Sequence, residues 1–190
     1  NYDGIFDQLT AGNYKYRMED KYGCTLEGRF TITEPEEFAI KSIDSSSVRT
    51  CNDDKTGYIK VGVKGGKSPV MISASGLNYY KETSDGIFSN LGANQYEIIA
   101  TDYRGCKADA YVTLYEPTKV SFEAKLAEEI KCYDNGAATI TTSAWGGTGS
   151  SYMVSLDNGA TFTQQAGEPF QVPEGKYRIV VKDENGCLPS

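Results

Sequence analysis

The segment Val172-Pro-Glu-Gly-Lys-Tyr177-Arg-Ile-Val-Val-Lys-Asp183-Glu-Asn-Gly186-Cys187 decides the fold, because its pattern occurs three times in this chain of 190 residues. Each copy has an apolar residue, a tyrosine five positions later, an aspartate six further on, and then x-x-Gly-Cys. The copies contain Tyr14, Asp20, Gly23 and Cys24; Tyr96, Asp102, Gly105 and Cys106; and Tyr177, Asp183, Gly186 and Cys187. Their cysteines lie 82 and 81 positions apart, which predicts a tandem repeat of about 81 residues.

A second series of landmarks sets the boundaries of the repeats. Cys51 and Cys132 are 81 positions apart, and residues 51–106 align with residues 132–187 without a gap. Glu34-Pro35 and Glu116-Pro117 close two copies. We therefore expect the C-terminal half of a truncated repeat at 1–35, a complete immunoglobulin-like repeat at 36–117, and a repeat lacking its last strand at 118–190. The chain is expected to be an excerpt of a longer array.

The repeats are expected to be β-structure. Residues 14–18, 96–100 and 177–181 alternate with a period of two, and residues 57–63 and 138–142 are rich in β-branched side chains. Asn and Gly pairs between these runs are typical of tight hairpin turns. Residues 123–129 have helix-forming composition but are too few for an independent helix. About seven short strands per repeat predict an all-β chain of tandem immunoglobulin-like β-sandwich repeats.

Two motifs predict local structure inside each repeat. Tyr14, Tyr96 and Tyr177 follow an apolar-x-x-Gly or similar element, which is typical of a tyrosine corner, whose phenol bonds back to the backbone. The Asp-x-x-Gly that follows is expected to be the turn between the last two strands, in which the carboxylate accepts backbone N–H groups and glycine takes a positive φ. Both motifs therefore predict a structural role.

Composition excludes several classes of function. The chain has no histidine, which removes histidine-based acid–base catalysis and most zinc sites, so we expect no enzyme and no cofactor. With 19 Lys and Arg against 26 Asp and Glu, nucleic acid is not an expected partner. No apolar run approaches the roughly 18 residues of a membrane span, so direct membrane insertion is not expected.

The string from Tyr177 to Cys187, preceded by Gly146-Gly147 and by Tyr152-Met-Val-Ser-Leu-Asp-Asn-Gly159, resembles the SprB-type repeat of giant surface adhesins in the Bacteroidetes. The middle unit departs from it, since Val70-Met-Ile-Ser-Ala-Ser-Gly76 stands where the Tyr-rich strand belongs and Asn94 replaces the glycine before Tyr96. The resemblance implies an exported cell-surface protein that uses the type IX secretion route and acts in gliding motility or adhesion.

The five cysteines predict disulfides in an oxidising, extracellular location, because no Cys-x-x-Cys pair is present. Pairing within a repeat, Cys51 with Cys106 and Cys132 with Cys187, leaves only Cys24 single and is slightly favoured. The alternative joins Cys51 to Cys187, because the two turns of one sandwich lie at opposite ends, beyond the about 7 Å that a disulfide allows between Cα atoms. Pairing of sequence neighbours, Cys24 with Cys51 and Cys106 with Cys132, ranks last.

Two kinds of ligand site are compatible with the sequence, and each has a structural alternative. Oxygen-rich clusters at Glu19-Asp20, Asn52-Asp53-Asp54, Asp134-Asn135 and Asp157-Asn158 could bind calcium, but turn-capping accounts for nearly all of them. Trp145, beside Gly146-Gly147, could stack on a sugar ring, although packing is the more common use of such a residue.

These observations favour a non-enzymatic structural segment of a cell-surface adhesin, whose repeats give reach and stiffness. Its expected partners are the neighbouring repeats of the same chain, together with surface polysaccharide or other cell-surface proteins. The alternative is a carbohydrate-binding module of an extracellular protein, with Trp145 as the ligand aromatic.

Overall fold

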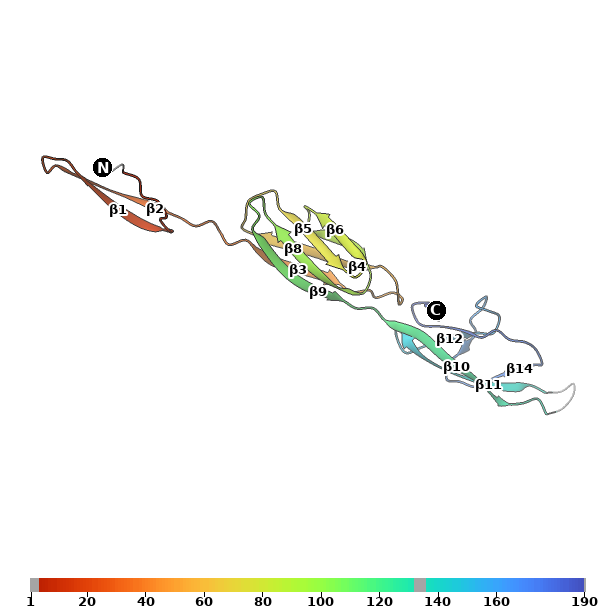
Figure 1. The fold of residues 1–190 in the computed structure, drawn as a ribbon. Coiled ribbons are helices and arrows are strands. Elements are labelled where there is room, and N and C mark those ends of the chain that lie inside the picture. The colour runs from red at the N-terminus through yellow and green to blue at the C-terminus, as the bar shows by residue number, and fades with distance from the viewer. Residues whose placement is uncertain (1–3, 132–135, 190) are drawn as a thin grey trace.

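The computed structural model describes residues 4–131 and 136–189, and it is all-β (Figure 1). No helix occurs in these described ranges. Within the same ranges, no helix is long and apolar enough to cross a membrane. The strands form three successive units along the chain.

The first unit is a two-stranded hairpin of β1 (Gly12–Glu19) and β2 (Thr25–Ile32). The strands pair antiparallel without a break, from Gly12 opposite Ile32 to Glu19 opposite Thr25. The connecting turn contains Asp20 and Gly23, so the hairpin is built from the repeated motif alone.

The middle unit contains seven strands in two sheets. They are β3 (Ala39–Ser46), β4 (Gly57–Lys64), β5 (Met71–Gly76), β6 (Tyr79–Thr83), β7 (Ile87–Leu91), β8 (Asn94–Thr101) and β9 (Lys107–Leu114). One sheet has the order β3-β4-β7 and the other β6-β5-β8-β9. Alternate side chains of both sheets, including Ile59, Phe88 and Ile98, are fully buried in one shared core. This arrangement is consistent with a β-sandwich.

The third unit repeats this plan with two long strands followed by four short ones. They are β10 (Thr118–Glu128), β11 (Ala138–Gly147), β12 (Met153–Ser155), β13 (Gln164–Gln165), β14 (Phe170–Val172) and β15 (Val180–Lys182). Its sheets have the orders β10-β11-β14 and β13-β12-β15, and its core includes Val154, Phe170 and Val181. Among the described residues of this unit, no strand corresponds to β9. The helix-forming run at 123–129 lies largely in β10, because pairing with β11 outweighs local propensity.

Strand pairing corrects the gap-free alignment of the two larger units. Met71 pairs with Thr101, and Met153 pairs with Lys182, so the two methionines are equivalent although they are 82 rather than 81 positions apart. The extra position is compensated at Asn90, whose φ of 58° accompanies a bulge between β4 and β7. With the corrected register, Val70-Met-Ile-Ser matches Tyr152-Met-Val-Ser, so the middle unit departs less from the repeat than the sequence alignment indicated.

The units follow one another along a line in Figure 1, with short connections between them. The connection between β3 and β4 reaches the end of the middle unit that faces the third unit, whereas the turn between β8 and β9 lies at the opposite end. The two cysteines of the middle unit are therefore at opposite ends of it.

Candidate functional site

The joint between the middle and third units is the most elaborate contact that the repeats make with one another. It is formed by the β3–β4 connection, here called the joint loop (Arg49–Asp54), which projects toward the third unit. The residues that anchor it come from the link between the units and from two loops of the third unit.

The link holds the joint loop from its own side. The Asn52 side-chain amide donates to the carbonyl of Pro117 at 3.0 Å, and the Asp53 N–H donates to the Glu116 carboxylate at 2.7 Å. Asp54 caps the loop by accepting the Cys51 N–H, and hydrogen bonds with Thr50 and Cys51 lower the pKa of its carboxyl. The Glu-Pro link is therefore part of the joint and fixes the conformation of the loop.

The third unit grips the same loop from the other side. Cys187 forms a disulfide with Cys51, with the Cα atoms 5.5 Å apart. The Asn185 side-chain amide donates to the carbonyl of Arg49 at 3.0 Å, and the Thr148 hydroxyl donates to that of Thr50 at 3.2 Å. The two hydrogen bonds go to backbone carbonyls, so apart from Cys51 they depend on the shape of the loop more than on its side chains.

One exposed ion pair adds to this grip. The Lys119 ammonium lies 3.6 Å from the Asp53 carboxylate, and both side chains are mostly exposed. A surface pair of this kind contributes about 0.2 to 1 kcal/mol. The ion pair therefore adds little to the stability of the joint, which depends mainly on the disulfide and the backbone hydrogen bonds.

Cys187 is placed by the Asp-x-x-Gly-Cys turn. The Asp183 carboxylate accepts the N–H groups of Asn185 and Cys187 through one oxygen and that of Thr148 through the other, at 2.7 to 3.0 Å. Gly186 has a φ of 83°, which a glycine adopts without steric cost. Asp183 thus joins the two loops that contact the joint loop.

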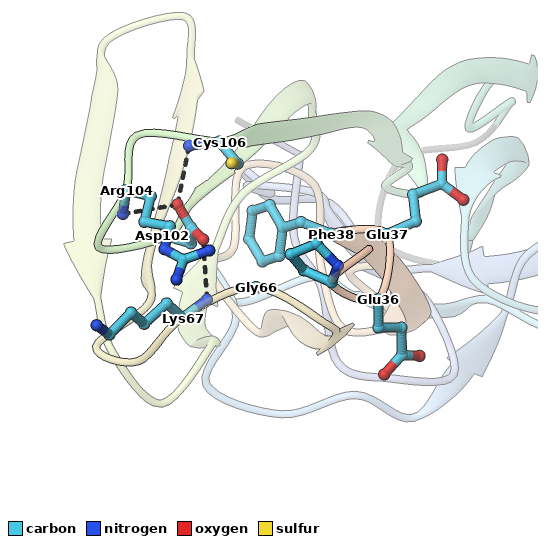
Figure 2. Close-up of a pocket in the computed structure, with 9 residues that line it drawn as sticks. Glu36, Glu37, Phe38, Gly66, Lys67, Asp102, Arg104 and Cys106 are labelled. Carbon is cyan, nitrogen blue, oxygen red and sulfur yellow. Dashed lines mark hydrogen bonds between the residues drawn. The ribbon is translucent and has the colours of Figure 1, made fainter. Parts of the chain in front are cut away.

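The same turn occurs in the other two units. Gly23 and Gly105 have φ values of 84° and 83°, and Asp20 and Asp102 accept the N–H groups of the residues two and four positions later. In the middle unit Asp102 also accepts the Lys67 N–H at 2.8 Å (Figure 2). That bond and those from Cys106 and Arg104 lower the pKa of the Asp102 carboxyl, because they stabilise its charged form.

The slightly favoured disulfide pairing within a repeat is wrong for both larger units, because Cys51 and Cys187, one from each predicted pair, are bonded to each other. Cys51 is bonded to Cys187, which was the alternative, and Cys106 is a free, exposed thiol. The reason is the topology stated above, since Cys51 and Cys106 lie at opposite ends of the unit. Cys24 is also free and exposed, so it is not bonded to Cys51, whereas Cys132 lies outside the described residues.

Each repeated tyrosine makes the hydrogen bond expected at a tyrosine corner. The phenols of Tyr14, Tyr96 and Tyr177 donate to the carbonyl four residues earlier, at 2.7, 3.0 and 3.0 Å. Tyr96 is 2% exposed and packs edge-on against Tyr79, and burial raises the pKa of its phenol. Each tyrosine thus bonds to the backbone of its own unit.

Trp145 lies on β11, opposite Ser121 of β10, and is 54% exposed. Its neighbours Ala144 and Gly146 are partly buried, so the ring projects from the outer face of the sheet. That face otherwise presents short polar and charged side chains, including Glu123 and Ser143. The structure therefore brings Trp145 to the surface but not to the joint.

The oxygen-rich clusters are engaged in turns. Asp157 accepts the Ser155 hydroxyl and the Thr161 N–H and hydroxyl, and these bonds, the first from Ser155, lower the pKa of its carboxyl to about 2. Glu19 pairs with Arg17. Within 4–131 and 136–189, no group of three Asp, Glu or Cys side chains could hold a metal ion. Asp134-Asn135 lies outside those ranges.

Sequence reasoning missed three side chains of the joint: Asn185, Thr148 and Lys119. All three are residue types that are common on protein surfaces. Only Asn185 lies in a motif that the sequence identifies, the Asp-x-x-Gly-Cys turn. No protein-family model and no curated protein sequence matches the chain.

Proposed function

We propose that the chain is a segment of tandem immunoglobulin-like repeats from a large exported cell-surface adhesin, in which it gives reach and stiffness. The observation that carries the proposal is the joint, where a disulfide and two backbone-directed hydrogen bonds fix one unit to the next. A contact of this kind limits hinge motion, which is the property that an extended shaft needs.

The strand order supports the immunoglobulin-like assignment. Strands β3, β4 and β7 correspond to A, B and E of such a sandwich, and β5, β8 and β9 correspond to C, F and G in the facing sheet. The tyrosine bond of Tyr96 lies at the entry to β8, where the F strand of these domains carries its tyrosine.

The disulfide supports an oxidising environment, and hence an exported protein. The resemblance to SprB-type repeats supplies the more specific setting, a role in gliding motility or adhesion after type IX secretion. The neighbouring repeats are the proposed partners, and surface polysaccharide or other cell-surface proteins are the proposed targets of the whole molecule.

Small-angle scattering of the oxidised chain tests the proposal. A compact globule of this length would have a radius of gyration of about 16 Å, and we expect a clearly larger value because the units lie end to end. The double variant Cys51→Ser, Cys187→Ser is expected to broaden the distribution of shapes while circular dichroism stays unchanged. Cys24→Ser is the matched control and is expected to change neither. A radius at the compact value contradicts the proposal.

A second function, recognition of polysaccharide, is favoured by one observation. Trp145 is 54% exposed on a polar face, and an exposed indole offers an apolar surface to the C–H face of a sugar ring. A glycan array with the wild-type chain and Trp145→Ala tests it. Binding that is lost in the variant supports this function, with Tyr111→Ala, another exposed aromatic on a strand of the middle unit, as the control.

A further inference from the structure

A cavity of about 500 Å³ lies at the end of the middle unit where Pro35 enters it (Figure 2). Phe38 lies between the Asp102 turn on one side and the Glu36-Glu37 segment on the other, and Arg104 and Lys67 extend along the rim. The free thiol of Cys106 belongs to the same wall. The cavity is therefore open, charged at its rim, and contains a nucleophilic group.

Every wall of this cavity has a counterpart at the joint of the third unit. The equivalent residues are Phe38 and Val120, Gly66 and Gly147, Lys67 and Thr148, Asp102 and Asp183, Arg104 and Asn185, and Cys106 and Cys187. Gly66 and Gly147 both have a positive φ, of 71° and 66°. Gly66 lies against the Phe38 side chain, and Gly147 lies against that of Val120. The two surfaces are thus copies of one site.

In the third unit this site holds the joint loop. Cys187 and Val120 are each 5% exposed there, whereas Cys106 is exposed and Phe38 is half-buried in the middle unit. The link that orients the joint loop is repeated too, since Glu34-Pro35 stands where Glu116-Pro117 accepts the bonds of Asn52 and Asp53. The cavity thus has both features found at the joint: the residues that contact the loop and a Glu-Pro link beside them.

We propose that this cavity is a binding site for the cysteine-bearing loop of another repeat of this kind, which is held by a disulfide to Cys106. Arg104 replaces Asn185 as the donor to the loop carbonyls, and Lys67 replaces Thr148. The inference rests on the proposed function and deepens it. It makes the joint a general connection, in which every repeat has a cysteine-bearing loop at one end and, at the other end, a binding site such as this cavity, here called the socket.

One substitution in the socket specifies the charge of the loop. Lys119, which pairs with Asp53 at the joint, is replaced by Glu37 in the middle unit. An aspartate at that loop position would face a like charge, whereas a lysine or arginine would find a partner. The socket of the middle unit therefore selects a loop that is basic where the joint loop is acidic.

The bond forms from two thiols that lose two electrons and two protons to a disulfide-bearing oxidant, which is reduced to a dithiol. In the test the oxidant is built into the probe, a peptide of residues 47–55 whose cysteine carries a 2-thiopyridyl group. The Cys106 thiolate attacks the peptide sulfur, the new disulfide forms, and 2-thiopyridone leaves with the electron pair.

Cys24 is the internal control, because it is exposed and occupies the same turn but lies in a hairpin without a socket. The experiment uses the full chain with Cys132→Ser and an intact Cys51–Cys187 bond, and mass spectrometry follows labelling of each cysteine. The rate at which the peptide labels each cysteine is divided by the rate at which the thiopyridyl derivative of glutathione labels the same cysteine, because the second rate reports the intrinsic reactivity of that thiol. We expect Cys106 to react at least about ten-fold faster than Cys24 on this scale, since docking raises the local concentration of the peptide.

Variants of the socket separate docking from chemistry. Arg104→Ala is expected to remove most of the preference for Cys106, and Arg104→Asn, which introduces the residue used at the joint, is expected to restore it. A peptide with Asp53→Lys is expected to react about two- to five-fold faster than the native peptide, and Glu37→Lys is expected to reverse that order.

Equal normalised rates at Cys106 and Cys24 would overturn the proposal, as would a preference that Arg104→Ala leaves intact. Faster formation of a dimer linked through Cys106 of two copies would assign the surface to a second chain instead. The scattering test of the Cys51–Cys187 joint does not involve Cys106, so failure here is distinguishable from failure of the proposed function.

Discussion

The hairpin β1–β2 and the strand pair β8–β9 have the same local structure but differ in what covers them. Both pair without a break over eight residues on each strand, both turn through Asp-x-x-Gly-Cys, and both have the tyrosine bond. On the inward face of β8, Tyr96, Ile98 and Ala100 are buried against the facing sheet. Their counterparts on β1 include Tyr16 and Met18, which are 38% and 55% exposed.

The difference separates what the motif does from what the core does. The turn and the register are local, because hydrogen bonds within about ten residues determine them. Stability of the unit requires the second sheet, since an isolated hairpin is marginal in water. Comparable substitutions at equivalent positions of the two pairs therefore measure the contribution of burial.

Removal of a core side chain gives the largest expected difference. Ile98→Ala should lower the free energy of unfolding of the middle unit by about 2 to 5 kcal/mol, because it leaves a cavity between the sheets. Tyr16→Ala, at the equivalent place in the hairpin, should leave the middle unit unchanged. Denaturant titration followed by hydrogen exchange of β8 measures both, and equal effects would contradict the comparison.

The turn glycines come next. Gly105→Ala and Gly23→Ala place a side chain at a φ of 83° or 84° in open space, so the cost is conformational and amounts to about 1 to 2 kcal/mol at each site. In the middle unit it should appear as a lower midpoint of unfolding. In the hairpin it should appear only as faster local exchange of the amides beside the turn. A change in global stability from Gly23→Ala would show that the hairpin is coupled to the core.

The tyrosine bond should have a smaller effect. Tyr96→Phe leaves the Gly92 carbonyl without its phenol donor in a partly buried site, and the expected loss is about 0.5 to 1.5 kcal/mol. Tyr14→Phe removes the same bond at a more exposed site, where water replaces the donor, so little change is expected. Thermal unfolding followed by circular dichroism compares the two. A larger loss of stability from Tyr14→Phe than from Tyr96→Phe would contradict the idea that burial determines the value of the bond.

The smallest expected effect concerns pH. The pKa of Asp102 is lower in the folded chain than the about 3.9 of an unfolded aspartate, so its contribution is fully present above about pH 4 and is lost as the pH falls through the folded value. Asp102→Asn should therefore destabilise the middle unit more at pH 6 than at pH 3, as measured by urea unfolding at both. An equal effect at the two pH values would contradict a charge-dependent role.

Sequence predicted the local and periodic parts of the structure. The tyrosine bonds and the Asp-x-x-Gly turns follow from residues less than ten positions apart, and hairpin pairing follows from alternation. The all-β class was predicted because strand signals recur in every copy. These features share one physical basis, since each is determined by neighbours along the chain.

The parts that were not predicted depend on distant segments. The one-residue shift between Met71 and Met153 is compensated by the bulge at Asn90, so the total length hides it. The preferred disulfide pairing was wrong because the number of cysteines per repeat does not show that Cys51 and Cys106 lie at opposite ends of the folded unit. The hydrogen bond from Asn185 to the Arg49 carbonyl joins residues 136 positions apart, and neither residue type marks the other as its partner.

The Cys51–Cys187 bond also determines how the chain would respond to tension. It joins residues 136 positions apart, so a pull between a point before Cys51 and a point after Cys187 passes through the two sulfur atoms. Strands β4 to β15 lie inside this covalent loop and carry none of the load. Reduction would place them in the load path and release about 450 Å of extended chain once they unravel. The bond thus sets the molecule's extensibility as well as its shape.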